Sequence, residues 1–214
     1  MRDYLKNLFL NTFKAAEAGS ETHRGSDEGK KADYKTLIIC VTVAFCLTMN
    51  RYLGDSSFLS SALSDLGLTE WRDKIFLSPN AQLYTLAWWV IVLCFFYFAL
   101  PVFIIKLFFH ERLSDYGLRL KGAFKDYSLY VIMLIVMIPL VFYFSRTESF
   151  QARYPFYDLG PGETFYPNLF IWEALYFLQF CTLEFFFRGF MVHGTKHRFG
   201  FYSVFVMTIP YCMI

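Results

Sequence analysis

Long apolar blocks alternate with polar segments along this chain. A helix needs about 20 mostly apolar residues to cross the hydrocarbon core of a bilayer, and each block approaches or exceeds that length. The pattern therefore predicts an all-α fold, a polytopic transmembrane helix bundle of about five spans. The expected spans are residues 36–53, 83–105, 127–145, 166–191 and 199–214.

The predicted spans differ in how cleanly they meet this requirement. Residues 83–105 and 127–145 contain no charged side chain, and Pro101 lies near the end of the first, where a kink is tolerated in a helix bundle. Residues 36–53 have a shorter uncharged core, so Lys35 and Arg51 must extend toward the membrane surfaces. The last block is still apolar at Ile214, so we expect it to be incomplete and the chain to be C-terminally truncated.

The N-terminal segment divides into two polar parts ahead of the transmembrane domain, which we expect at 36–214. Residues 1–17 alternate apolar and basic positions at helical spacing, which predicts an amphipathic interfacial helix on an anionic membrane surface. A helix that binds a protein partner is an equal alternative. Residues 18–35 are rich in glycine and charge, which predicts a flexible linker.

Composition supports the membrane interpretation and excludes other classes. Hydrophobic residues make up 56% of the 214 residues and charged residues 18%, against about 25% charged in soluble domains. Five spans leave no room for a separate soluble catalytic domain of ordinary size. The net charge is only +2 and no basic stripe is present, so nucleic-acid binding is not indicated. Membrane lipids are the first expected partners.

The distribution of lysine and arginine predicts the orientation in the membrane. Fifteen of them lie in 1–35, 106–126 and 188–198, against five in 50–82 and 146–164. Because cytoplasmic loops carry the excess of positive charge, the first three segments are expected in the cytoplasm. We therefore expect a multi-pass integral membrane protein, in the plasma or inner membrane if bacterial, with a cytoplasmic N-terminus. Between the first two spans, apolar residues from Phe58 to Leu66 ahead of Gly67 predict a short interfacial helix.

The fourth span carries three ionisable side chains, Glu173, Glu184 and Arg188. A charge at the centre of a spanning helix costs about 2.5–3.5 kcal/mol on insertion scales, so such residues are usually paired and functional. Glu184 and Arg188 are four residues apart and can pair across one helical turn. With Glu173, Phe177 and Phe180 they form one stripe, which we expect to face the bundle interior. A buried ion pair that only fixes helix register is an equal interpretation.

Three segments resemble motifs of a family of intramembrane proteases. Residues 183–190 read LEFFFRGF and residues 197–200 read HRFG, while residues 112–120 read RLSDYGLRL. These resemble the first signature and an upstream stretch of the CPBP family, which includes the CAAX prenyl endopeptidases and the Abi or bacteriocin-processing proteins. The resemblance covers about residues 83–214. Leu183 stands where the family has its first signature glutamate, and the family's later histidine signatures would lie beyond Ile214.

The resemblance implies an intramembrane endopeptidase, in which a glutamate activates water to hydrolyse a membrane-anchored peptide or protein substrate. It assigns Glu184 as the candidate catalytic base or site organiser and Arg188 as its electrostatic partner, toward the cytoplasmic side. Two alternatives remain open. One is a noncatalytic scaffold, such as an immunity factor, chaperone or assembly partner, which Leu183 favours. The other is a small transporter whose Glu184 and Arg188 line the substrate path, although no internal repeat supports it.

No cofactor or metal site is expected from the sequence. His193 and His197 are four residues apart and could bind one metal ion from one helical face. Both lie in a basic loop beside Lys196 and Arg198, so contact with lipid head groups is the favoured interpretation.

Overall fold

The computed structural model describes residues 33–119, 127–152, 154, 156–158 and 165–212. The predicted helix at 1–17 and most of the predicted linker at 18–35 lie outside this part of the chain. All regular structure within it is helical, which confirms the all-α prediction. Three helical runs there are long and apolar enough to cross a membrane, at Tyr34–Leu53, Ala81–Leu107 and Asn168–Tyr211.

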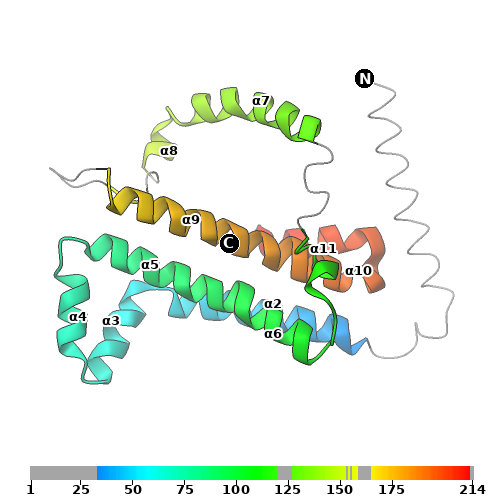
Figure 1. Ribbon diagram of the computed structural model, residues 1–214, viewed down its shortest axis with the longest axis horizontal. Coiled ribbons are helices and arrows are strands. Elements are labelled where there is room, and N and C mark those ends of the chain that lie inside the picture. Colours follow the sequence, from blue (N-terminus) through cyan, green and yellow to red (C-terminus); the bar gives the residue numbers. More distant parts are fainter. Residues whose placement is uncertain (1–32, 120–126, 153, 155, 159–164, 213–214) are drawn as a thin grey trace.

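The helices lie alongside one another in a bundle with short elements at both ends (Figure 1). In chain order they are α2 (Tyr34–Leu53), α3 (Ser56–Asp65), α4 (Thr69–Phe76), α5 (Ala81–Cys94), the π-helical η2 (Phe95–Ala99), α6 (Leu100–Leu107), the 3₁₀ turn η3 (Leu113–Tyr116), α7 (Tyr127–Phe144), α8 (Glu148–Gln151), α9 (Asn168–Glu184), the π-helical η4 (Phe185–His193), α10 (Gly194–Phe199), η5 (Gly200–Tyr202) and α11 (Ser203–Tyr211).

The first span begins slightly earlier than predicted. The Asp33 side chain accepts a hydrogen bond from the Thr36 backbone N–H at 3.1 Å and so caps α2, which starts at Tyr34 within the expected linker. The short helix expected before Gly67 is confirmed as α3, and Gly67 has the positive φ of 72° that a helix stop requires.

The second span contains the irregularity expected near Pro101. Proline has no N–H and crowds the carbonyl four residues earlier, which here belongs to Tyr97. Directly before α6, the helix changes from α-helical to the wider π-helical winding of η2 over Phe95–Ala99. In a π-helix each N–H bonds to the carbonyl five residues earlier instead of four, and this spacing allows the helix to continue past the proline.

The last two predicted spans form a helical hairpin. The chain turns at Gly200, where φ is 55°, and α11 packs back against η4. The rings of Phe187 and Tyr211, 24 positions apart in sequence, lie 5.2 Å apart across this hairpin. By length and composition the whole stretch Asn168–Tyr211 counts as one candidate span although the chain turns within it, so the predicted number of five spans stays a prediction.

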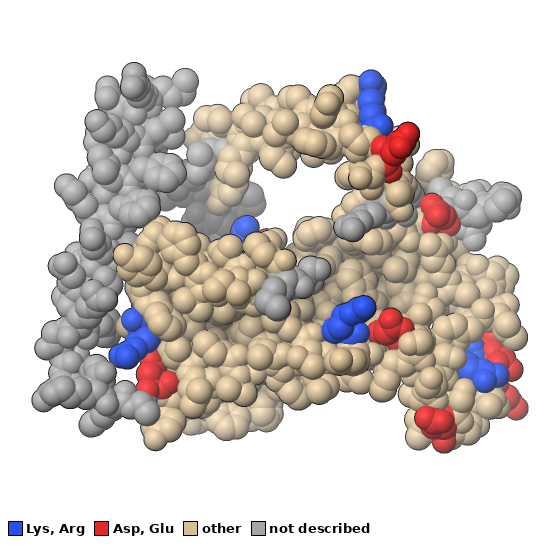
Figure 2. Space-filling view, turned by 180° about the vertical axis from the view of Figure 1, so that it is seen from behind, with Lys and Arg blue, Asp and Glu red and all other residues tan. Residues whose placement is uncertain are grey.

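The third predicted span forms the helix α7, whose fully described stretch Tyr130–Phe144 is a shorter apolar helix than the three candidate spans. It lies apart from the bundle, and the space-filling view shows an opening between it and the remaining helices (Figure 2). Its described side chains are exposed on every face. A helix that is apolar all round requires an apolar surrounding, so α7 is suited to lipid or to a membrane partner.

Most of the core lies where α2, α5 to α6 and η4 meet. Its fully buried side chains are mainly aromatic and β-branched, and they include Ile39, Val43, Leu93, Tyr97, Ile105, Tyr116, Phe186, Phe187 and Phe190. A second cluster, built on Leu83, Val90, Tyr157 and Trp172, joins α5 to α9. The beginning of η4 is thus the best-packed part of the described chain.

Candidate functional site

The two predicted site residues, Glu184 and Arg188, form an ion pair. Glu184 is the last residue of α9, and Arg188 lies one turn later in η4. Arg188 Nη1 lies 2.9 Å from Glu184 Oε2, and the two side chains are 68% and 41% exposed, respectively. The ion pair is therefore formed within one helix and remains accessible from outside the chain.

The expected orientation of the charged stripe is wrong. Glu173, Phe177 and Phe180 are exposed, and the face of α9 that packs against α5 carries Trp172 and Gln179 instead. Helical spacing correctly places the stripe on one face. It could not identify the buried face, because polar residues occur on both faces of α9, Glu173 on the exposed side and Gln179 on the buried side, and the amphipathic signal is therefore very weak.

The segment that follows Glu184 is wound as a π-helix and buried over most of its circumference. Phe185, Phe186, Phe187 and Phe190 are all buried, and the Phe186 ring stacks on Tyr97 with centroids 4.4 Å apart. Arg188 is exposed among them. Single π-helical segments inside α-helices are frequent at functional sites, and this one begins at the ion pair.

Two glycines in this region allow a close approach to Tyr116 in η3. A Cβ atom added at Gly189 would lie 2.6 Å from the Tyr116 carbonyl oxygen. A Cβ atom added at Gly194 would lie 2.6 Å from Ile39 Cδ1 and 3.2 Å from Tyr116 Cε1. Since real Cβ atoms do not approach so closely, both positions need glycine for the observed packing.

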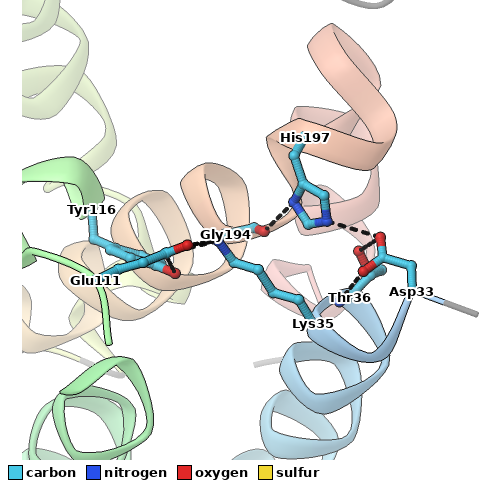
Figure 3. Close-up of polar contacts among 7 residues, drawn as sticks. All are labelled: Asp33, Lys35, Thr36, Glu111, Tyr116, Gly194 and His197. Atoms are coloured by element: carbon cyan, nitrogen blue, oxygen red, sulfur yellow. Dashed lines mark hydrogen bonds and ion pairs between the residues drawn. The ribbon is translucent and has the colours of Figure 1, made fainter. Parts of the chain in front are cut away.

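A polar cluster holds Tyr116 from the other side. Its hydroxyl donates to Glu111 Oε2 at 2.5 Å, and Lys35 Nζ donates to the two Glu111 oxygens at 2.6 and 2.8 Å. Lys35 also lies 5.6 Å from the centre of the Tyr116 ring. Figure 3 shows these residues converging from α2 and from the segment between α6 and α7. Because Tyr116 is only 2% exposed, its hydroxyl needs this partner.

A second set of contacts joins α10 to the start of α2 (Figure 3). His197 Nε2 lies 2.8 Å from Asp33 Oδ2, and His197 Nδ1 lies 2.9 Å from the Gly194 carbonyl oxygen. Asp33 also accepts a hydrogen bond from the Thr36 hydroxyl at 2.6 Å. We call the residues Asp33, Lys35, Glu111, Tyr116 and His197 the polar latch.

Burial and the contacts of the latch shift the pKa values of Asp33, Glu111 and Tyr116. Partial burial raises the pKa of Asp33, but hydrogen bonds from Thr36 and His197 outweigh it and leave that pKa below its usual range. The pKa of Glu111 is lowered in the same way, since hydrogen bonds from Lys35 and Tyr116 outweigh its burial. Burial, and then the Glu111 carboxylate, raise the pKa of Tyr116.

The two histidines considered as metal ligands have different neighbours. His197 faces Asp33, whereas His193 Nε2 lies beside Gly117, 3.8 Å from where a Cβ of that residue would be. Within the described part of the chain, no group of three or more histidine, cysteine, aspartate or glutamate side chains gathers as a metal site would require. His197 is better explained as a latch residue.

Few features of the amino-acid sequence indicate the latch. Asp33 three residues before Thr36, at the start of an apolar block, is a capping pattern and was the one available signal. The two contacts that connect distant segments, Lys35 with Glu111 and His197 with Asp33, join residues 76 and 164 positions apart.

Comparison of the chain with models of protein families, with curated proteins and with solved structures finds no match.

Proposed function

We propose that this protein is an intramembrane endopeptidase of the CPBP type, which hydrolyses peptide bonds in membrane-anchored substrates. The observation that carries the proposal is the accessible ion pair of Glu184 and Arg188 at the point where α9 becomes π-helical. A carboxylate that is to receive a proton from water must be reachable by water, and 41% exposure of Glu184 meets that requirement.

In this reaction Glu184 accepts a proton from a water molecule, and the water oxygen attacks the carbonyl carbon of the substrate peptide. The tetrahedral intermediate collapses as the carbon–nitrogen bond breaks, and the proton passes to the leaving amine. The products are a carboxylate and an amine, with one water consumed. Arg188 holds Glu184 in one orientation and offsets the negative charge that develops nearby.

The grouping of polar segments at one end of the bundle supports a cytoplasmic site. The start of α2, the segment before α7 and α10 all meet in the polar latch. These are the segments that the distribution of lysine and arginine assigns to the cytoplasm. The ion pair lies one to three turns from this end along η4, so a multi-pass arrangement would open the candidate site inward.

A noncatalytic scaffold is the second candidate, and one observation favours it. Leu183, which stands in place of the family's first glutamate, packs against the main hydrophobic core. The buried residues of that core are hydrophobic, which suits a leucine better than a second carboxylate. On this alternative the ion pair fixes the orientation of η4 and the protein acts through binding.

The two candidates are separated by comparing new N-termini among membrane proteins of source cells that carry the wild-type gene or a variant. Glu184→Gln and Arg188→Ala should each abolish the same set of wild-type termini at equal protein level. Glu173→Gln is the matched control, since this exposed glutamate lies on the same helix outside the ion pair. Survival of all termini in both site variants would refute proteolysis and leave the scaffold.

A further inference from the structure

The connection between α2 and α5 forms a small helical hairpin at the end of the bundle opposite the polar latch. Figure 1 shows α3 and α4 lying across the ends of α2 and α5 instead of continuing them. Both flanking helices are candidate membrane spans, so the hairpin stands at the height of a membrane surface. A helix that lies across the ends of spans runs along the plane of the bilayer.

The first helix of the hairpin packs its apolar side on the protein. Leu59 of α3 is buried, and α3 contacts both α4 and α5. The Arg72 guanidinium of α4 donates to the Ser64 hydroxyl of α3 at 3.1 Å, which ties the two helices together. The hairpin is therefore folded against the bundle, and α4 keeps a fixed outward side.

The exposed side of α4, together with its two ends, combines large apolar side chains with the charged residues Glu70, Asp73 and Lys74. Leu68, Trp71 and Lys74 follow one another at intervals of three residues and share one face, and Trp71 is 59% exposed. The Lys74 ammonium lies 5.1 Å from the centre of the Trp71 ring. Leu66 and Leu77 flank the helix and are 73% and 80% exposed. Nothing in the described part of the chain covers this set.

We propose that α4 is an interfacial anchor, whose Leu66, Leu68, Trp71 and Leu77 side chains insert into the boundary between lipid head groups and acyl chains. Tryptophan is enriched at this depth because its ring is apolar and its N–H is polar. Lys74 extends over the Trp71 ring, so its ammonium group reaches the head groups while its stem stays on apolar surface. This inference does not depend on the proposed proteolysis.

The charges around the anchor identify the type of lipid contact. Residues 51–77 carry Arg51, Arg72 and Lys74 against Asp55, Asp65, Glu70 and Asp73. With one more acidic than basic group, attraction to anionic lipid cannot supply the contact, and Figure 2 shows acidic and basic side chains mixed at this end. The anchor therefore binds by apolar insertion and should hold equally well in a zwitterionic bilayer.

Fluorescence of the full chain in phosphatidylcholine vesicles tests the proposal. The fluorescence of Trp71 is obtained by subtracting the emission of the Trp71→Phe variant from that of the wild type. This substitution preserves an apolar aromatic ring. The Trp71 fluorescence should be quenched by lipids brominated near the head group and protected from iodide in the aqueous phase. Replacing part of the phosphatidylcholine with phosphatidylglycerol should leave both results unchanged. Trp172→Phe is the matched control, since that tryptophan is buried in the protein core and should respond to neither quencher.

Three outcomes would overturn the proposal. Strong iodide quenching without bromine quenching would place Trp71 in water. Protection from both quenchers in purified vesicles would place it against protein. A bromine effect that appears only with anionic lipid would replace apolar insertion by electrostatic attraction. Leu77→Asp provides a second measurement, because a charge at the inserted edge should reduce the bromine quenching of Trp71 while the Trp172 signal stays unchanged.

Discussion

The close packing of α10 on α2 leads to a quantitative prediction for Gly194→Ala. The new methyl group would lie 2.6 Å from Ile39 Cδ1, the far end of a fully buried side chain, and 3.2 Å from the Tyr116 ring. Ile39→Val removes that Cδ1 atom and nothing else from the contact. The two substitutions together should therefore be better tolerated than their separate effects suggest.

The expected magnitudes follow from the two contacts. Overpacking a filled core costs about 1–3 kcal/mol, whereas replacing glycine by alanine within a helix gains about 1 kcal/mol. Gly194→Ala should therefore lower the free energy of unfolding by about 0–2 kcal/mol. Ile39→Val alone should cost about 0.5–1.5 kcal/mol through its cavity. In the double variant the new methyl fills that cavity, so the pair should be more stable than the sum by about 1–2 kcal/mol.

Reversible unfolding of the four proteins in one mixed-micelle system, followed by circular dichroism, measures this coupling. Gly189→Ala is the comparison, since its methyl would meet the Tyr116 carbonyl oxygen at 2.6 Å, and Ile39→Val removes no atom from that contact. Gly189→Ala should thus show no rescue. If Gly194→Ala and Ile39→Val are additive within about 0.5 kcal/mol, the packing described between α10 and α2 is wrong.

The latch makes two further predictions about pH. The pKa of Tyr116 is raised in the folded state, so the contribution of the Tyr116 hydroxyl to the free energy of unfolding is complete below about pH 10 and declines as pH rises further. Tyr116→Phe should therefore flatten the alkaline limb of a plot of unfolding free energy against pH. The pKa values of Asp33 and Glu111 are lowered, so their stabilisation is present above about pH 4 and is lost as pH falls through the folded values. Glu111→Gln should weaken the acid limb in denaturation from pH 6 to 2, and an unchanged profile would contradict the latch.

The positions of two of the three candidate membrane-spanning helices could be predicted closely, because they depend on block length and hydropathy alone. Residues 83–105 were expected and the helical run covers Ala81–Leu107, while 36–53 became Tyr34–Leu53. The extra residues at the start of α2 come from the cap that Asp33 provides, which extends the helix beyond its apolar block. Glu184 and Arg188 were found for a similar reason, since a pair four residues apart is a local property of a helix.

The remaining features depend on tertiary packing. The buried side of α9 is set by its contact with α5, and a helix with polar residues on both its exposed and its buried faces does not reveal that side in its sequence. The π-helical winding of η4 is equally hidden, because phenylalanine-rich sequence is compatible with an ordinary α-helix. Latch contacts such as Lys35 to Glu111 join segments that only the folded chain brings together.

Continuous packing leads from the start of α2 to the candidate ion pair. Lys35 holds Glu111, and Glu111 accepts a hydrogen bond from the Tyr116 hydroxyl. The Tyr116 carbonyl lies against Gly189, which directly follows Arg188. An exposed ion pair such as Glu184 with Arg188 contributes only about 0.2–1 kcal/mol to stability. Burial of the aromatic core around η4 stabilises the fold by itself. In the proposed reaction the same packing would have a second role, because a glutamate that activates water needs its guanidinium partner in a fixed position, and this packing fixes the backbone next to Arg188.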